Sequence, residues 1–328
     1  MKVSFTGVSK RQEFFSQNTG YGKLFKKLYD NISKTEYEPV LNDRSAPIAI
    51  CCENPSWLYK EGNQYTIGYT THESTEMMQE WIDNLDTVDE IWTPSEFIAD
   101  IIRKYTNKQV LNVPIFVDDT FKPVRRRKDT PFFFLHVGEP AVRKGGSLVL
   151  ECFAEIFKDN PNVFMVFKSF GNTPNLIGSN LYSNVIVIGS DYSEEEMNSL
   201  YAKMHCLVYP TMGEGGGFIP LEAMFTGLPT ISTTQWSDYK KFIKLPIKSG
   251  FVDVPNDIIK NTPLRGQFIL PDKESVKEQM LEVYENYKKY EEIYSNQVEE
   301  LRKEHSWERV VNKIVVPRLR EIKGNNGN

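Results

Sequence analysis

The sequence predicts an α/β protein made of two doubly wound domains. Its 328 residues are too many for one compact core and are enough for two domains. In both halves, short apolar runs alternate with amphipathic segments, as they do when parallel strands are joined by crossover helices. A polar stretch at 118–130 lies between the halves and is typical of a solvated linker.

The first half is expected to carry the smaller of the two sheets. Its apolar runs predict strands at 3–7, 47–52, 65–69, 90–93 and 110–113. Its amphipathic segments predict helices at 21–32, 75–85 and 95–105. Strand and helix therefore follow each other in turn, which favours a parallel sheet.

The second half shows the same alternation more clearly. Its strands are predicted at 132–137, 163–170, 184–188, 206–209 and 229–232, and its first helices at 147–158, from Ser193 and from Pro220. Ser193 and Glu196 form a capping-box pattern before an apolar stripe, which is typical of a helix start. Two more helices are expected, one from Ser275, capped by Glu278, towards 305, and one at 306–322.

Composition points to an ordinary globular protein that remains in the cytoplasm. Hydrophobic residues make up 40% and charged residues 25% of the chain, and the formal net charge is -5. No apolar stretch approaches the roughly 20 residues of a membrane helix, and 1–10 lacks a signal-peptide pattern. We therefore expect no integral membrane segment.

Cysteine and metal-ligand patterns predict buried free thiols and no metal site. Cys51 and Cys52 are neighbours on a predicted strand, and Cys152 and Cys206 lie in apolar patterns. The sequence has no Cys-x-x-Cys and no Asp-x-Asp pair. We accordingly expect no metal and no cofactor.

The most informative segment is the glycine-rich loop at 210–229, which follows a strand and opens a helix. Gly213, Gly215, Gly216 and Gly217 allow a close backbone approach, and the helix start offers unpaired N–H groups to an anion. Glu214 and Glu222 can face one crevice and accept hydrogen bonds from sugar or ribose hydroxyls. The alternative is a plain glycine-rich connection with two solvent-facing glutamates.

This Glu-x7-Glu segment resembles that of the retaining GT-B glycosyltransferases of the group 1, or GT4, family. The resemblance extends over 91–307 and includes Ile-Trp-Thr-Pro-Ser-Glu-Phe at 91–97, Val-Pro-Ile-Phe-Val-Asp at 113–118, and His-Val-Gly-Glu-Pro-Ala-Val-Arg-Lys-Gly at 136–145. It implies two Rossmann-like doubly wound domains that face a cleft. The implied parts are a short acceptor-side domain at 1–120, a nucleotide-sugar-binding domain at 131–305, and a helix at 306–328 that crosses back to the first domain.

The resemblance places Glu214 beside the donor sugar and Glu222 on the nucleotide ribose. Physical reasoning adds Arg143 and Lys144, because a departing diphosphate builds negative charge that cations can stabilise. The family often has arginine where this chain has Glu139. The full set of expected donor-binding residues is Gly20, Gly22, Gly138, Lys168, Gly215, Gly216, Gly217, Phe218 and Glu222.

The amino-terminal half contributes two further candidates. The loop that ends in Asn18-Thr-Gly-Tyr-Gly22 resembles the family's glycine loop near the donor phosphates, although a plain turn into a helix explains it equally well. His72, which follows a predicted strand, resembles a histidine placed over the transferring sugar. A structural hydrogen-bonding role is the alternative for His72.

The sequence therefore predicts a metal-independent hexosyl- or pentosyltransferase that uses a nucleotide-diphosphate sugar. A glycan or small glycoside is the favoured acceptor. The basic run at 125–128 leaves open an enzyme that modifies hydroxymethylated DNA. Glu139 leaves open a catalytically silent subunit that binds nucleotide sugars.

Overall fold

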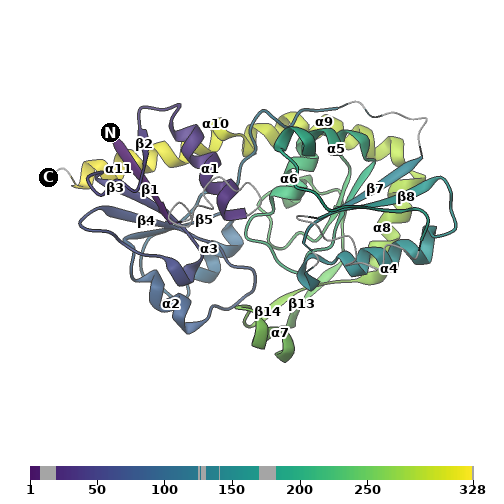
Figure 1. Ribbon diagram of the computed structural model, residues 1–328, viewed down its shortest axis with the longest axis horizontal. Coiled ribbons are helices and arrows are strands. Elements are labelled where there is room, and N and C mark those ends of the chain that lie inside the picture. The colour runs from purple at the N-terminus through teal and green to yellow at the C-terminus, as the bar shows by residue number, and fades with distance from the viewer. Residues whose placement is uncertain (8–19, 125, 127–130, 140, 170–181, 327–328) are drawn as a thin grey trace. The chain divides into compact units, whose positions relative to one another are not determined.

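The computed structural model describes residues 1–7, 20–124, 126, 131–139, 141–169 and 182–326 (Figure 1). These residues divide into two compact units. Unit 1 comprises Met1–Phe116, Asp253–Gln267 and Glu304–Asn328, and unit 2 comprises Val117–Val252 and Phe268–Lys303. Each unit is therefore built from separate stretches of the chain.

The sheet of unit 1 has six parallel strands in the order β2-β1-β3-β4-β5-β6. The strands are β1 (Lys2–Gly7), β2 (Glu38–Leu41), β3 (Ile48–Cys52), β4 (Tyr65–Tyr69), β5 (Glu90–Thr93) and β6 (Val110–Asn112). All predicted strands are present. The sequence missed β2 because this edge strand is short, carries Pro39 and is largely exposed. With β2, the sheet equals that of unit 2 in strand number, so the prediction of a smaller sheet is wrong.

Helices flank both faces of this sheet (Figure 1). Helix α1 (Gly20–Ile32) buries Leu24, Phe25 and Leu28 on one stripe. The other helices are α2 (Gln79–Leu85), α3 (Glu96–Ile102), α10 (Trp307–Val310) and α11 (Val316–Asn326), with a π-helical segment at Val311–Val315 between the last two. The carboxyl-terminal amphipathic helix predicted at 306–322 is therefore present, interrupted by this π segment.

The sheet of unit 2 has six parallel strands in the order β12-β11-β10-β7-β8-β9. They are β7 (Phe132–Val137), β8 (Val163–Lys168), β9 (Val185–Ile188), β10 (Cys206–Tyr209), β11 (Thr230–Ser232) and β12 (Leu245–Pro246). Helices α4 (Gly146–Phe157) and α8 (Lys273–Glu285) cover one face, and α5 (Glu194–Lys203), α6 (Phe218–Phe225) and α9 (Tyr287–His305) cover the other (Figure 1). The fold is the doubly wound arrangement that the sequence predicts.

Helix boundaries in unit 2 follow local hydrogen bonds. The capping box of α5 is confirmed, because the Glu196 N–H donates to Ser193 Oγ and the Ser193 N–H donates to Glu196 Oε2. The predicted start at Ser275 is wrong. Asp272 caps α8 instead, accepting the Ser275 N–H at 2.6 Å, so the helix begins earlier. A break at Asn286 then separates α8 from α9.

A two-stranded ribbon lies outside both large sheets and was not predicted. It consists of β13 (Ser249–Asp253) and β14 (Gln267–Pro271), and helix α7 (Asn256–Asn261) lies between them in the chain. Much of β13 is exposed, so its sequence lacks the apolar run by which buried strands are recognised. The ribbon leads the chain out of unit 2 into the segment Asp253–Gln267 of unit 1.

The linker prediction for 118–130 is wrong at Arg126, which is buried rather than solvated. Its guanidinium donates to the carbonyls of Tyr201 and Met204, at the end of α5, and of Thr226 and Gly227, just after α6. Carbonyls at helix ends lack partners within the helix. Arg126 therefore caps two helices with one side chain. The other basic residues of the run lie outside the described residues.

Surface and thiol chemistry are those of an ordinary globular fold. All four cysteines are free and buried, as predicted.

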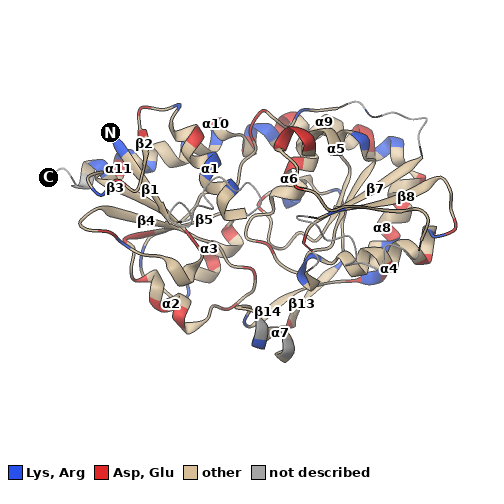
Figure 2. Ribbon diagram, viewed as in Figure 1, with Lys and Arg blue, Asp and Glu red and all other residues tan. Residues whose placement is uncertain are grey.

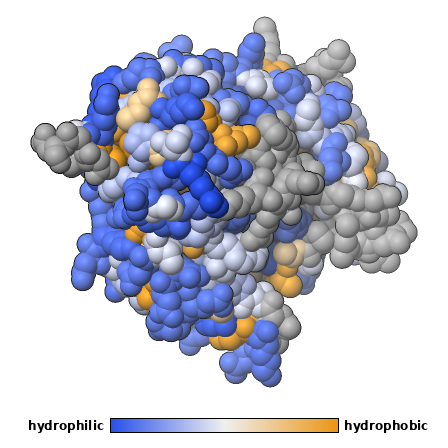
Figure 3. Space-filling model, turned by 60° about the vertical axis from the view of Figure 1, so that its left-hand side comes forward, coloured by the Kyte–Doolittle hydropathy of each residue, from blue (hydrophilic) through white to orange (hydrophobic). Residues whose placement is uncertain are grey.

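Acidic and basic residues are interspersed along the helices (Figure 2), and apolar side chains occur in small separate groups on the face shown in Figure 3. Across the part of the chain that the structure describes, every helix falls short of the length and apolar character needed to span a membrane.

Candidate functional site

The strand order of unit 2 reverses between β7 and β10, and candidate residues gather beyond the carboxyl ends of these strands. Ligands of doubly wound sheets bind at such a reversal. The turn Val142–Lys144 meets the loop after β10 there, because the Met212 N–H donates to Arg143 O at 2.8 Å. Gly145 has φ of 75°, and a Cβ on it would lie 2.6 Å from Pro210 O, so glycine is required for this approach.

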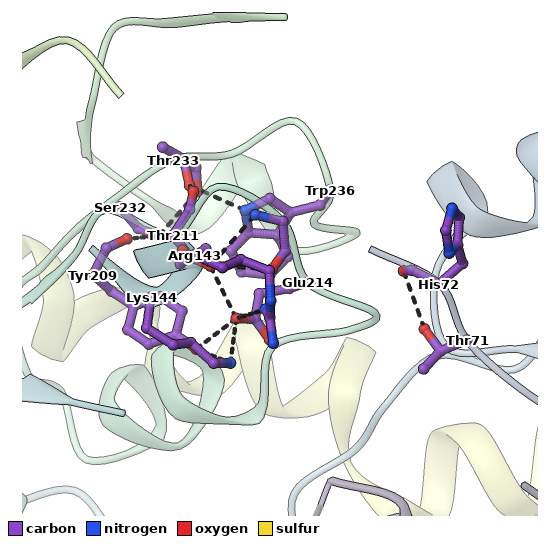
Figure 4. A network of polar contacts seen from close by, with 11 residues as sticks. Thr71, His72, Arg143, Lys144, Tyr209, Thr211, Glu214, Ser232, Thr233 and Trp236 are labelled. Atoms are coloured by element: carbon purple, nitrogen blue, oxygen red, sulfur yellow. Dashed lines mark hydrogen bonds and ion pairs between the residues drawn. The ribbon is translucent and has the colours of Figure 1, made fainter. Parts of the chain in front are cut away.

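The carboxylate of Glu214 is the centre of the cluster (Figure 4). Its Oε1 atom accepts hydrogen bonds from Lys144 Nζ at 2.6 Å, Tyr209 Oη at 2.9 Å, Thr211 Oγ1 at 3.0 Å and Arg143 Nη1 at 3.3 Å. Arg143 Nη1 also donates to Gly213 O at 2.6 Å. Two cations and two hydroxyls thus converge on a single oxygen atom, which defines a site built to hold an anionic oxygen.

Burial and charge act in opposite directions on Glu214, which is only 7% exposed. Burial alone would raise the pKa of its carboxyl group. The charges of Lys144 and Arg143 and the hydrogen bonds from Lys144 and Tyr209 outweigh burial and lower this pKa below its ordinary value. Glu214 is therefore a carboxylate at neutral pH, and the Tyr209 hydroxyl beside it, whose pKa is raised by burial and by that charge, remains protonated.

Helix α6 presents the rest of the predicted motif. It begins at Phe218 rather than at Pro220, and Gly217, with φ of 74°, is its amino-terminal cap. A Cβ on Gly217 would lie 2.2 Å from the Trp236 ring, so this glycine is needed for packing. The neighbouring Gly215 and Gly216 are buried in the same loop.

Glu222, in α6, is completely buried in this structure. Its Oε2 accepts a hydrogen bond from Tyr201 Oη at 3.3 Å. Burial and the charge of Glu222 raise the pKa of Tyr201, so its hydroxyl remains a donor. Each glutamate of the motif thus accepts a hydrogen bond from a tyrosine, Tyr209 for Glu214 and Tyr201 for Glu222. Arg143 and Lys144 pair with Glu214.

Lys168 and Gly138 lie at the ends of the neighbouring strands. Lys168 Nζ donates to Ser169 O at 2.7 Å and to Ser190 O at 2.6 Å. Burial lowers the pKa of this lysine. Gly138 packs against Lys144, because a Cβ on it would lie 3.3 Å from Lys144 Cβ. Lys168 is therefore turned towards backbone carbonyls here, whereas Gly138 makes room for Lys144.

The candidates of unit 1 form a second group around the carboxyl end of β4. The Tyr21 hydroxyl donates to Thr71 O at 3.3 Å and accepts the Thr71 N–H at 3.1 Å. This ties the turn that carries Gly20 and Gly22 to the loop that carries His72. The preceding part of the glycine loop, Asn18 and Thr19, lies outside the described residues.

His72 is buried, and its two ring nitrogens differ in their hydrogen bonding. Nε2 lies 2.6 Å from Glu76 O, and since a carbonyl can only accept, Nε2 carries the hydrogen. Nδ1 is a buried acceptor that has no hydrogen-bond partner within the described structure. Burial lowers the pKa of His72 to about 4, so the ring is neutral at pH 7.

Sequence reasoning missed the hydroxyl residues that contact the two motif carboxylates, namely Tyr201, Tyr209 and Thr211. It also missed Tyr21, which bonds to Thr71 beside His72. Tyr209 and Thr211 flank Pro210 at the end of a predicted strand, so a search for hydroxyls beside the motif would have found them. Tyr21 and Tyr201 come from other elements, and no local pattern marks them.

Two other predictions concern the site, namely that it holds no metal and that the basic run at 125–128 could bind DNA. Across the described ranges, no three His, Cys, Asp or Glu side chains are grouped as metal ligands. Arg126, the part of the basic run that the structure describes, is committed to backbone carbonyls. It is therefore not available to bind a nucleic-acid phosphate.

A family model and several solved structures are similar to this chain. Residues 117–260 match the family model described as glycosyl transferases group 1. No curated protein sequence matches the chain. Among solved structures, a sucrose-phosphate synthase from Thermosynechococcus elongatus is similar with a TM-score of 0.71 and 13% identity, over 98% of this chain and 99% of that one.

Two further structures are similar over most of their length. Anabaena HepE in complex with UDP-glucose has a TM-score of 0.62 and 11% identity, over 97% of this chain and 99% of that one. WaaG, a glycosyltransferase involved in lipopolysaccharide biosynthesis, has a TM-score of 0.62 and 11% identity, over 91% and 95%. At sequence identities this low, structural similarity establishes a shared fold and nothing more. The chain thus has the GT-B fold, and its residues 117–260 match the glycosyl transferases group 1 family model.

Proposed function

We propose that this chain is a retaining glycosyltransferase that moves a sugar from a nucleotide-diphosphate donor to a hydroxyl acceptor without a metal ion. The observation that carries the proposal is the pair of cations, Arg143 and Lys144, converging at the strand-order reversal of unit 2. This pair lies within the region that matches the family model. Anions and ligands of doubly wound folds bind at this position.

The cations would stabilise the departing diphosphate. Glu214 Oε1 lies between Arg143 and Lys144, where an anionic oxygen of a diphosphate would lie. As the bond from the anomeric carbon to the phosphate oxygen breaks, charge builds on that oxygen, and preorganised cations stabilise it. The acceptor oxygen bonds to the same carbon on the side from which the diphosphate leaves, and its proton passes to the leaving phosphate.

The two motif glutamates would have different roles. Once a diphosphate oxygen takes over the cations, the Glu214 carboxylate is released to accept hydrogen bonds from the sugar hydroxyls. Glu222 would accept hydrogen bonds from the nucleotide ribose. Because Glu222 is fully buried against Tyr201, ribose binding requires the residues that cover Glu222 to rearrange.

His72 would orient the transferring sugar as a neutral acceptor. Its Nε2–H is committed to Glu76 O, and its lowered pKa excludes a positive charge at pH 7. The Nδ1 atom can accept a hydrogen bond from a sugar hydroxyl. Binding there supports positioning of the reacting carbon rather than acid catalysis.

A UDP-sugar is the first donor to test, because the similar HepE structure contains UDP-glucose. The acceptor proposed is a hydroxyl of a glycan or small glycoside. The experiment is a panel of nucleotide sugars, first for thermal stabilisation and then for transfer to simple glycosides, with the product anomer read by NMR.

Retention of the donor's anomeric configuration, with activity that survives EDTA, is expected. Inversion of the anomeric configuration would exclude attack on the side from which the diphosphate leaves. Activity that is lost in EDTA and restored by magnesium would exclude metal independence. Donor binding with neither transfer nor hydrolysis would identify a catalytically silent subunit instead. Turnover of hydroxymethylated DNA but not of glycosides would identify the DNA-modifying alternative.

A further inference from the structure

A short segment of chain between two stretches of unit 2 is part of unit 1 and holds the loop that carries His72. The segment is Asp253–Gln267. Its last three residues, 265–267, which we call the clamp, pair with residues 74–76. The Thr75 N–H donates to Gln267 O at 2.9 Å, and the Glu76 N–H donates to Arg265 O at 3.3 Å. The clamp thus supplies backbone partners to the residues just after His72.

Side-chain hydroxyls complete the pairing. The Gln267 N–H donates to Thr75 Oγ1 at 2.8 Å, and the Arg265 N–H donates to Ser74 Oγ at 3.0 Å. Ser74 is almost fully buried, and its Oγ also lies 3.0 Å from His72 Nε2. The same hydroxyl therefore contacts both the clamp and the imidazole ring.

The clamp also contacts the residue whose carbonyl faces His72 Nε2. Glu76 is held by Arg265 through its N–H, and its carbonyl accepts from His72 Nε2 at 2.6 Å. With Nε2 protonated, Nδ1 is left as the acceptor. A histidine held in one tautomer by its neighbours presents a defined acceptor to a ligand.

Gly266 is the residue on which this arrangement depends. Its φ is 67°, which β-branched residues adopt only with strain. A Cβ on Gly266 would lie 2.7 Å from both Glu76 Cγ and Thr75 Oγ1. A larger residue at 266 would therefore force the clamp, or the side chains of Thr75 and Glu76 that it meets, to shift.

We infer that the clamp is a positioning element for His72, and that Ser74 and Gly266 are its positioning residues. The inference rests on the proposed role of His72 in orienting the donor sugar. It adds that a segment flanked by unit 2 sets the position and tautomer of that histidine. Loss of the clamp should reduce sugar transfer while nucleotide binding, assigned to unit 2, is retained.

The test uses two variants with one matched control in the full-length chain. Gly266→Val removes the close approach, and Ser74→Ala removes the shared hydroxyl without altering the backbone. Gly250→Ala is the control, because it lies on the same ribbon and a Cβ there meets nothing within 4 Å. Each protein is compared for UDP affinity, kcat/KM for transfer, and the 15N shifts of the His72 ring.

Both variants are expected to change the 15N shifts of His72 and to lower kcat/KM about tenfold to a hundredfold, as misplacing a substrate-contacting group does. UDP affinity should stay within about twofold, and the control should match the parent chain. In a His72→Ala background, neither variant should lower kcat/KM further, because the group that it positions is absent.

Unchanged His72 shifts in Gly266→Val and Ser74→Ala would overturn the inference, whatever the activity. An additive loss of kcat/KM in the His72→Ala background would also overturn it, since the clamp would then act elsewhere. If His72→Ala alone leaves transfer unchanged, the proposed function of His72 fails, whereas altered ring shifts still support the clamp.

Discussion

At the scale of single residues, the chemistry of unit 2 centres on one carboxylate oxygen. Glu214 Oε1 receives contacts from Arg143, Lys144, Tyr209 and Thr211. Both cations are largely buried, with side chains 20% and 15% exposed. Such charges are stable only when they are paired, so an anionic partner is required whether or not a donor is bound.

The first prediction follows from the charge that develops during the reaction. Arg143→Ala or Lys144→Ala should lower kcat by about a hundredfold, the scale of one lost electrostatic partner, and lower donor affinity less. Single-turnover kinetics and donor titration separate the two effects. Lys241→Ala, a change of an exposed lysine of unit 2, is the control. Near-normal kcat in both variants would remove this turn from the mechanism.

A change at Glu139 provides a second test of the role of Arg143, because Glu139 lies where the resembling family often has arginine. It is exposed in this structure. The structure pairs Arg143 with Glu214 and Gly213 O. Glu139→Arg should therefore preserve or raise kcat. A strong loss would show instead that Glu139 holds Arg143 in position.

The second prediction concerns pH and two buried histidines, His72 and His136. Burial lowers the pKa of each to about 4, from an ordinary value of 6.5. Between these values the unfolded chain binds protons that the folded chain does not, so stability falls as pH falls from 6.5 to 4. Between pH 7 and pH 5 each histidine should contribute a loss on the order of 2 kcal/mol.

Urea unfolding at several pH values measures this slope. His136→Asn should make the slope shallower, because asparagine does not titrate and can still donate to Val208 O, as His136 Nδ1 does at 2.9 Å. The slope is the readout, since the smaller side chain lowers stability at every pH. An unaltered slope would show that His136 is not buried in its neutral form.

At the scale of elements, α11 is attached to the sheet of unit 1 by a buried ion pair. Glu90, on β5, is completely buried and accepts from Arg318 Nη2 at 2.8 Å. Trp92 Nε1 and Tyr65 Oη donate to the same carboxylate. Helix α11 is thereby joined to β5, the strand next to the edge strand β6.

The third prediction compares two arginines of that helix. Arg318→Met leaves Glu90 buried with its charge uncompensated, which should lower the free energy of unfolding by about 3 kcal/mol or more. Arg320→Met is the matched control, because Arg320 pairs with Glu36 at the surface, where its side chain is 63% exposed. Urea unfolding measures both. Equal losses in the two variants would contradict the role of the buried pair.

At the scale of the whole molecule, the chain passes between the units after Phe116, Val252, Gln267 and Lys303. Strand β14 takes part in both units. Gln267 bonds to Thr75 in unit 1, and the Ile269 N–H donates to Met212 O, in the Glu214 loop of unit 2. The two candidate groups are thus joined through the covalent chain.

The fourth prediction is a division of roles between the units. Glu222→Ala should weaken binding of the nucleoside diphosphate and of the donor alike, because a ribose contact is made before and during the reaction. His72→Ala should leave UDP affinity unchanged and lower kcat/KM for transfer. Calorimetric titration with UDP distinguishes these results. Unchanged UDP affinity in Glu222→Ala would remove Glu222 from the nucleotide site.

The sequence by itself determined the features that depend on neighbouring residues. Continuous apolar runs predicted ten of the twelve strands in the two large sheets, and both strands that it missed, β2 and β12, are short edge strands. The Ser193–Glu196 capping box and the glycine-rich loop were also visible, because each is a local pattern.

Only the tertiary structure decided which distant groups meet. Arg126 reads as part of a solvated basic run, yet it caps α5 and α6, and the clamp at 265–267 carries no local pattern that points to Ser74. Such partners lie far apart in the chain and are brought together by packing that also pairs buried polar groups. Local periodicity records which face of an element is buried, but not what lies against it.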